Sequence, residues 1–350
     1  MGTFFKVIGA LVVVAVLLAG AGIAFLAIRK PAMRPASTEK VEATPARLAR
    51  GEYLTLHVAD CLECHSDFTS GQFGLPPKPG TEGQGGYPFD QRLGVPGVVQ
   101  AQNITPDPET GIGRWTDGEV IRAIREGVNK DGQALFPQMP YPYFRSMSDE
   151  DVRSIVVYIR TLKPIHHPIQ KRKLDFPVNF LIKNAPRPVD GPVAMPDPEK
   201  DHLGYGKYLV TIAGCQECHT AHDNHGQLVR GREFAGGWEM LGPWGRVVTA
   251  NITPDPNTYM GQATKDEFIG RIKSFESLTG ENSPVAPKGR NTIMPWLQFS
   301  GMTKEDLGAI YDYLKTLPPI PHKVEPFPDA PLPPTPAASP APTPAPTPGS

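Results

Sequence analysis

The sequence predicts an all-α protein in which two tandem copies of one helical module follow an N-terminal membrane-spanning helix. Three observations predict this arrangement. Residues 7–28 are continuously apolar, the pentapeptide Cys-X-X-Cys-His occurs twice, and the same landmarks follow each pentapeptide in the same order. The pentapeptides use all four cysteines of the chain, so one repeated unit accounts for every thiol.

The N-terminal segment, residues 1–30, is expected to be a transmembrane anchor. Its apolar run over residues 7–28 is long enough to cross a bilayer as one helix, and basic residues flank it on both sides. A cleaved signal peptide is the alternative, because Ala19-Gly20-Ala21 offers small residues to a peptidase. Residues 31–45 are rich in proline, alanine and polar residues, which is typical of a linker.

The two pentapeptides indicate covalent attachment of haem. Two thiols one helical turn apart can add to the two vinyl groups of one haem, while the adjacent imidazole reaches the iron. A structural zinc site or a pair of redox dithiols is the alternative. Zinc sites, however, usually bring their cysteine pairs within a few tens of residues, and a dithiol needs no histidine at a fixed offset. The residues concerned are Cys61, Cys64 and His65 in the first copy, and Cys215, Cys218 and His219 in the second.

A second axial ligand is expected from the methionines that recur in register. Met139 and Met294 lie at almost the same distance after each pentapeptide, and both precede a proline and an aromatic residue. Met147 and Met302 also recur, but they stand just before a helix start, where packing explains them. Thioether ligation by Met139 and Met294 would fill both irons and favour the ferrous state.

Each module is expected to contain three helices. Residues 48–59 and 205–213 deliver the first cysteine of each copy, and capping boxes open the second helix. Proline ends the third helix of each module. Short β pairings around residues 98–100 and 247–249 are compatible with the pattern but are not predicted. The capping boxes are Thr116 with Glu119 and Thr264 with Glu267, the third helices start at Ser148 and Thr303, and the modules span residues 46–165 and 201–321.

The segments outside the modules are rich in proline. Residues 166–200 form a connector, and its apolar residues indicate that part of it packs against the modules. Its basic run, residues 171–173, is expected to be a solvated face. Residues 322–350 are expected to be a disordered or polyproline tail, because proline, alanine and threonine alternate there without periodicity. The net charge of −1 argues against binding of nucleic acid.

These motifs carry a resemblance to a known family. Each half resembles a class I cytochrome c domain, and the pair is similar to the multihaem cytochrome c subunits of bacterial membrane-bound dehydrogenases for alcohols, gluconate and related substrates. The resemblance rests on the pentapeptides, the methionine-proline-aromatic triplets, the connector 174–179 and the duplicated Asn-Ile-Thr-Pro-Asp-Pro, at 103–108 and 251–256. Those subunits usually carry three haems, whereas two motifs exist here. Trp115 in the first copy is also matched by Ala263 in the second.

The resemblance implies a fold of two tandem class I cytochrome c domains and a function in electron transfer. We expect a membrane-anchored carrier with two covalently bound haem c and no catalytic residues of its own. Its redox partner would be a dehydrogenase subunit, a quinol-oxidising complex or a terminal oxidase, in a respiratory or photosynthetic chain. Because haem attachment of this type is expected outside the bacterial inner membrane, the modules should lie in the periplasm behind one membrane span. A dihaem peroxidase-like enzyme with one open haem is the alternative.

Overall fold

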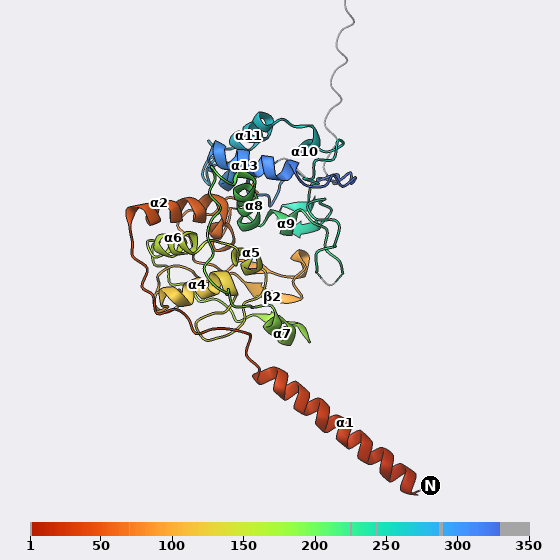
Figure 1. Ribbon diagram of the computed structural model, residues 1–350. Coiled ribbons are helices and arrows are strands. Elements are labelled where there is room, and N and C mark those ends of the chain that lie inside the picture. The colour runs from red at the N-terminus through yellow and green to blue at the C-terminus, as the bar shows by residue number, and fades with distance from the viewer. Residues whose placement is uncertain (1, 70, 225, 243, 287–289, 330–350) are drawn as a thin grey trace, which may run out of the picture.

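The computed structural model describes residues 2–329, except 70, 225, 243 and 287–289. One long helix, α1 (Gly2–Ile28), projects from a globular part in which two helical modules lie against each other (Figure 1). Every residue of α1 is exposed, and among the described helices it is the one long and apolar enough to cross a membrane.

The first module is built from short helices that begin where the sequence provides caps. The Thr44 hydroxyl accepts a hydrogen bond from Arg47 N–H at the start of the helix that precedes the first cysteine. The predicted capping box at Thr116 is present, and the Ser148 side chain caps the last helix as expected. The elements are α2 (Pro45–Tyr53), a π-helical turn (Leu54–Val58), α3 (Cys61–Cys64), a 3₁₀ turn (Gln91–Leu93), α4 (Asp117–Glu126), α5 (Tyr141–Phe144) and α6 (Asp149–Ile159).

The second module follows the connector and repeats this order of helices, with one additional short helix before its capping box. Its predicted capping box at Thr264 and the cap at Thr303 are both present. The connector carries α7 (Val178–Leu181) and a 3₁₀ turn (Ile182–Asn184). The module then contains α8 (His202–Ile212), α9 (Cys215–Cys218), α10 (Tyr259–Gln262), α11 (Lys265–Lys273), α12 (Trp296–Phe299) and α13 (Lys304–Lys315).

The two modules differ by one residue before the first cysteine, and a π-helical turn absorbs the difference. Ten positions separate Gly51 from Cys61, but nine separate Gly206 from Cys215. The extra residue falls within Leu54–Val58, which the first module winds as a π-helix and the second does not. A π-turn accommodates one additional residue without breaking the helix, so both cysteines start their turn in an equivalent place.

The described residues also include five short strands, which the all-α prediction did not contain. Glycine- and proline-rich segments follow each pentapeptide, and their backbone groups need partners, which short antiparallel pairings provide. The strands β2 and β5 fall on the two segments where pairing was compatible with the sequence. The first sheet has the order β1 (Pro88–Phe89), β2 (Gly97–Gln100), β3 (Lys173–Leu174), and the second pairs β4 (Glu239–Gly242) with β5 (Gly245–Val248).

One hydrophobic core extends across both modules. Two reciprocal hydrogen bonds cross the boundary: Tyr53 donates to Asp306 at 2.6 Å, and Tyr208 donates to Asp151 at 2.6 Å. Asp306 lies in the first turn of α13, and Asp151 lies in the first turn of α6. The helix before the pentapeptide of each module therefore binds the start of the last helix of the other module. Within the first module, Gly51 is required where α2 crosses α6, because a Cβ there would overlap the main chain of α6.

A second, smaller core lies around the strands and includes part of the segment predicted to be an unstructured tail. Phe327 packs against this core, and Val248 N–H donates to Pro326 O at 3.0 Å. Residues 322–329 are therefore held against β5, which corrects the start of the predicted tail. Residues 330–350, where the remaining part of that prediction falls, lie outside the described residues.

Candidate functional site

Each Cys-X-X-Cys segment forms one isolated helical turn. The turns α3 and α9 follow residues in the left-handed conformation, Asp60 with φ 45° and Gly214 with φ 66°. This conformation turns the chain sharply after the preceding helix. The histidine N–H closes each turn on the first cysteine carbonyl, at 3.1 Å for His65 and 2.9 Å for His219. Both thiols of a pair and the imidazole are therefore grouped on one turn.

Both imidazoles are held by a main-chain carbonyl through the same nitrogen. His65 Nδ1 lies 2.6 Å from Gln102 O, and His219 Nδ1 lies 2.7 Å from Ala250 O. Because a carbonyl only accepts, Nδ1 carries the proton in each ring and Nε2 keeps its lone pair for a metal. Burial lowers the pKa of both histidines, which favours the neutral form that coordinates iron.

The duplicated Asn-Ile-Thr-Pro-Asp-Pro motif supports these carbonyls. In the first module, Asn103 Oδ1 accepts hydrogen bonds from Thr105 N–H at 2.9 Å and from its hydroxyl at 2.7 Å. Asn103 Nδ2 donates to Ile165 O at 2.8 Å, which fixes the chain leaving α6. The motif thus clamps the segment that starts one residue after Gln102.

Asn251 makes the equivalent contacts in the second module. It accepts from Thr253 N–H at 2.9 Å and donates to Ile320 O at 2.9 Å. Sequence reasoning used the motif to find the repeat but did not give it this role, and it missed the Gln102 and Ala250 carbonyls. The letter-for-letter repetition directly after these two residues was the available signal.

The two predicted methionine ligands occupy equivalent loops. Met139 and Met294 are partly buried against the main core, directly before α5 and α12. In both loops the methionine carbonyl accepts a hydrogen bond from the backbone N–H two positions later. The donors are Tyr141 and Trp296, each at 2.8 Å. Met147 and Met302 are instead almost completely buried in the core, as their packing interpretation predicts.

The segment after the first methionine loop contacts the second pentapeptide across the module boundary. Tyr143, four residues after Met139, donates a hydrogen bond of 2.6 Å to Glu217 Oε2 inside the second pentapeptide. Burial opposes ionisation of Glu217, but hydrogen bonds from His222 and Tyr143 lower its pKa.

The opposite pair of loops is joined in a comparable way. Gly74 N–H, after the first pentapeptide, donates to Asn291 Oδ1 at 3.0 Å, and Asn291 Nδ2 donates to Gln72 O at 3.0 Å. Asn291 stands three residues before Met294. The loop after the first pentapeptide therefore packs on the methionine loop of the second module. Sequence could not reveal this proximity, because the partners lie more than two hundred residues apart.

The donor set fits haem better than zinc. Within the described part of the chain, no group of three or more His, Cys, Asp or Glu side chains could hold a metal ion by itself.

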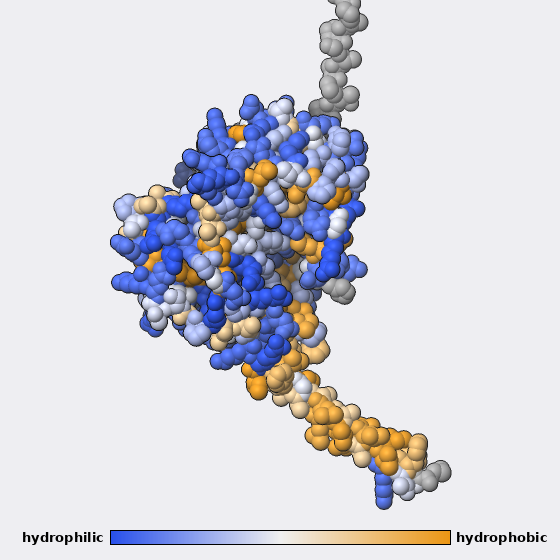
Figure 2. All heavy atoms as spheres, viewed as in Figure 1, coloured by the Kyte–Doolittle hydropathy of each residue, from blue (hydrophilic) through white to orange (hydrophobic). Residues whose placement is uncertain are grey.

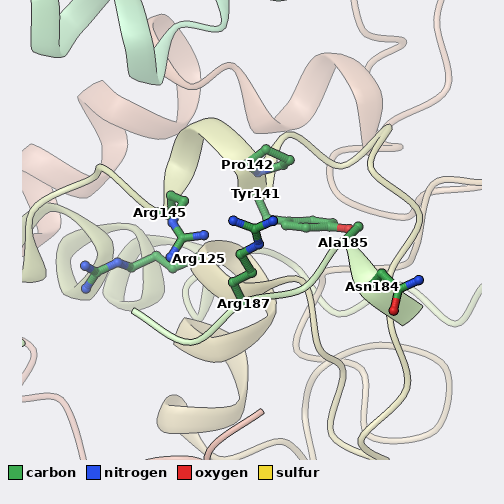
Figure 3. A pocket seen from close by; sticks show the side chains of 7 residues that line it. All are labelled: Arg125, Tyr141, Pro142, Arg145, Asn184, Ala185 and Arg187. Carbon is green, nitrogen blue, oxygen red and sulfur yellow. The ribbon is translucent and has the colours of Figure 1, made fainter. Parts of the chain in front are cut away.

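A distinct cavity of about 250 Å³ lies between α5 and the connector, and none of the predicted ligands lines it. Figure 3 shows the guanidinium groups of Arg145 and Arg187 beside Tyr141 there.

Two Cys-X-X-Cys-His turns with imidazoles anchored in the same way are typical of the haem attachment sites of c-type cytochromes. No protein-family model matches the chain. The chain is 30% identical over 293 residues to the cytochrome c subunit of a quinone-linked alcohol dehydrogenase from Gluconacetobacter polyoxogenes, covering 80% of this chain and 58% of that subunit. It is 30% identical over 302 residues to the fructose dehydrogenase cytochrome subunit of Gluconobacter japonicus, covering 82% and 56%.

A diheme c-type cytochrome of Cereibacter sphaeroides is 31% identical over 235 residues, which cover 64% of this chain and 73% of that protein. The chain belongs to the family of c-type cytochromes that contains these proteins. It spans less than two thirds of the dehydrogenase subunits that it matches. The family resemblance found in the motifs is therefore confirmed.

Proposed function

We propose that the chain is a membrane-anchored dihaem cytochrome c that relays single electrons between a dehydrogenase and a later acceptor. Residues 46–165 and 201–321 would form tandem class I cytochrome c domains, each holding one covalent haem c. The function would be that of a carrier, with the substrate oxidised on another subunit. Cytochrome subunits of alcohol and fructose dehydrogenases among the relatives support this choice of donor.

The proposal assigns a role to each residue of the two sites. When bound, haem c supplies reversible one-electron exchange at its iron. The four cysteines would hold it through thioether bonds, and Nε2 of His65 and His219 would each ligate an iron. Met139 and Met294 would supply the second protein ligand of each iron. The Gln102 and Ala250 carbonyls keep each imidazole in the Nδ1–H tautomer and increase its basicity.

The observation that carries the proposal is the matched anchoring of the two imidazoles. Contacts of 2.6 Å and 2.7 Å to equivalent carbonyls appear in both modules, each from the residue directly before the repeated Asn-Ile-Thr-Pro-Asp-Pro motif. The packing of the second pentapeptide against Tyr143 adds support for a relay, because electrons would cross a single protein interface between the two centres.

The N-terminal helix supports a membrane location for this carrier. In the proposal, α1 remains uncut and crosses the bacterial inner membrane once. The modules then lie in the periplasm, where they can receive electrons from a dehydrogenase subunit. The acceptor would be a quinone-linked complex or a terminal oxidase.

The first experiment counts haems and identifies their ligands. Full-length protein purified from membranes should contain two haem c per chain by pyridine haemochrome analysis, and the reduced form should not bind carbon monoxide promptly. His65→Ala and His219→Ala should each change the spectrum of one haem, whereas His202→Ala, on the surface, should change neither. One haem per chain, or prompt carbon monoxide binding to the unmodified protein, would contradict the closed dihaem carrier and favour a peroxidase-like enzyme.

A further inference from the structure

A group of exposed apolar side chains lies on the connector. Phe176 is 77% exposed and Leu181 is 57% exposed, although both belong to the segment around the short helix α7. Phe180 lies against Phe176, with ring centroids 6.1 Å apart. Figure 2 shows hydrophobic residues gathered where the globular part meets α1. Apolar groups that cluster on a surface in this way indicate an interaction site.

A pair of hydrogen bonds fixes the position of this cluster beside the end of α1. Lys183 Nζ donates to Leu26 O at 2.8 Å and to Ala27 O at 2.7 Å. These carbonyls belong to the last turn of α1, whose partial negative charge attracts a cation. Phe180 is one helical turn before Lys183, so the aromatic pair lies at the level where α1 ends (Figure 1).

The charge around the cluster is strongly positive. Residues 171–187 contain five basic side chains and one acidic side chain, Asp175. Lys171 and Lys173 are exposed, and neither takes part in an ion pair within the described residues. Aromatic side chains flanked by lysines are typical of the boundary between a bilayer and water, and each lysine near an anionic surface adds attraction.

We propose that the connector surface, formed by Lys171, Lys173, Phe176, Phe180 and Leu181, rests on the bilayer that α1 crosses. The aromatic and leucine side chains enter the headgroup region, and the lysines contact anionic lipid headgroups. This inference rests on the proposed membrane anchoring of the chain. A lipid surface is the expected occupant because the space beside the last turn of a membrane-spanning helix is filled by headgroups.

The consequence is a second point of attachment that fixes the orientation of the modules. A helix alone, followed by the linker 31–45, would leave the globular part free to turn. Contact through the connector surface holds one side of the first module towards the membrane. The second module, on the side away from α7, then faces the aqueous compartment (Figure 1).

The test measures the depth of single spin labels in the full-length holoprotein. The four native cysteines are consumed by haem attachment in the proposed function, so an introduced cysteine is the one free thiol. Labels would be placed by Phe176→Cys, Leu181→Cys and, as a control on α11 far from α1, Asp266→Cys. The labelled protein is reconstituted in vesicles of equal parts phosphatidylcholine and phosphatidylglycerol.

Labels at Phe176 and Leu181 should respond more strongly to oxygen than to a water-soluble nickel chelate, and the label at Asp266 should show the reverse order. Equal, water-like responses at all three positions would overturn the inference. The inference would also be overturned if neither reagent reached the labels at Phe176 and Leu181, because protein would then cover the surface. A fourth label, Val14→Cys in α1, separates the two proposals. If the label at Val14 lies in lipid and the label at Phe176 lies in water, the connector contact alone is rejected. If the label at Val14 lies in water, the membrane anchor is rejected.

Discussion

The clamp formed by Asn103 gives the sharpest prediction about how the chain holds its first histidine. Asn103→Ala removes the acceptor of Thr105 N–H, which is completely buried, and the donor to Ile165 O. A buried N–H without an acceptor costs about 1–3 kcal/mol, and the second lost bond costs about 0.5–1.5 kcal/mol. The free energy of unfolding should therefore fall by about 1.5–4.5 kcal/mol.

The same substitution should also affect the electrochemistry of one haem. When the segment after Gln102 loosens, the contact between the Gln102 carbonyl and His65 weakens. Contacts of this kind influence the reduction potential of a metal site. Potentiometric titration of Asn103→Ala should show one shifted midpoint potential and one unchanged. Asn251→Ala should shift the other potential, so the two variants serve as controls for each other.

Urea titration and potentiometry of both variants would check the reasoning. Asn179→Ala, at an exposed position without a hydrogen bond in the described structure, is the matched control and should change neither quantity. A loss of stability below about 0.5 kcal/mol in Asn103→Ala, the level of an ordinary surface substitution, would refute the clamp. Equal shifts of both potentials in one variant would refute the assignment of one clamp to one histidine.

The remaining predictions concern the module boundary, helix packing and the turns. Tyr208→Phe should lower the free energy of unfolding in urea by about 1.5–3 kcal/mol, because it removes a buried hydrogen bond to the charged Asp151, and an unchanged midpoint would contradict this. Gly51→Ala should cost at least about 3 kcal/mol in the same assay through overlap with α6. Gly270→Ala, with open space around it, should be neutral or stabilising by up to about 1 kcal/mol. Hydrogen bonds from a neighbouring threonine lower the pKa of Asp107, so its stabilisation is present above about pH 4 and lost as the pH falls further. Asp107→Asn should flatten the melting temperature against pH in that acidic range, and an unaltered profile would contradict the prediction.

Local patterns predicted most of the helical elements and both attachment turns. The capping boxes at Thr116 and Thr264 were predictable because their partners lie three residues apart. The pentapeptides were equally readable, since their chemistry requires fixed spacing. The methionine assignment rests on recurrence in register and stays a prediction.

Contacts between distant segments were beyond the reach of the sequence. The carbonyls that hold His65 and His219 have no side-chain signature, so only their positions next to a repeated motif hinted at them. The Tyr53–Asp306 bond joins residues about two hundred and fifty positions apart. The π-helical turn was hidden because a one-residue difference between repeats does not say where the chain absorbs it. The short strands were missed because two- to four-residue pairings carry little periodicity.

The most direct test of the dihaem carrier is the near-infrared charge-transfer band that ferric haem shows when a methionine sulfur ligates the iron. In Met139→Leu and in Met294→Leu the account predicts loss of about half of this band, and the double variant should lose all of it. Met147→Leu, in the core, should retain the full band. A band that survives in the double variant would show that other groups close the iron sites and would contradict the account.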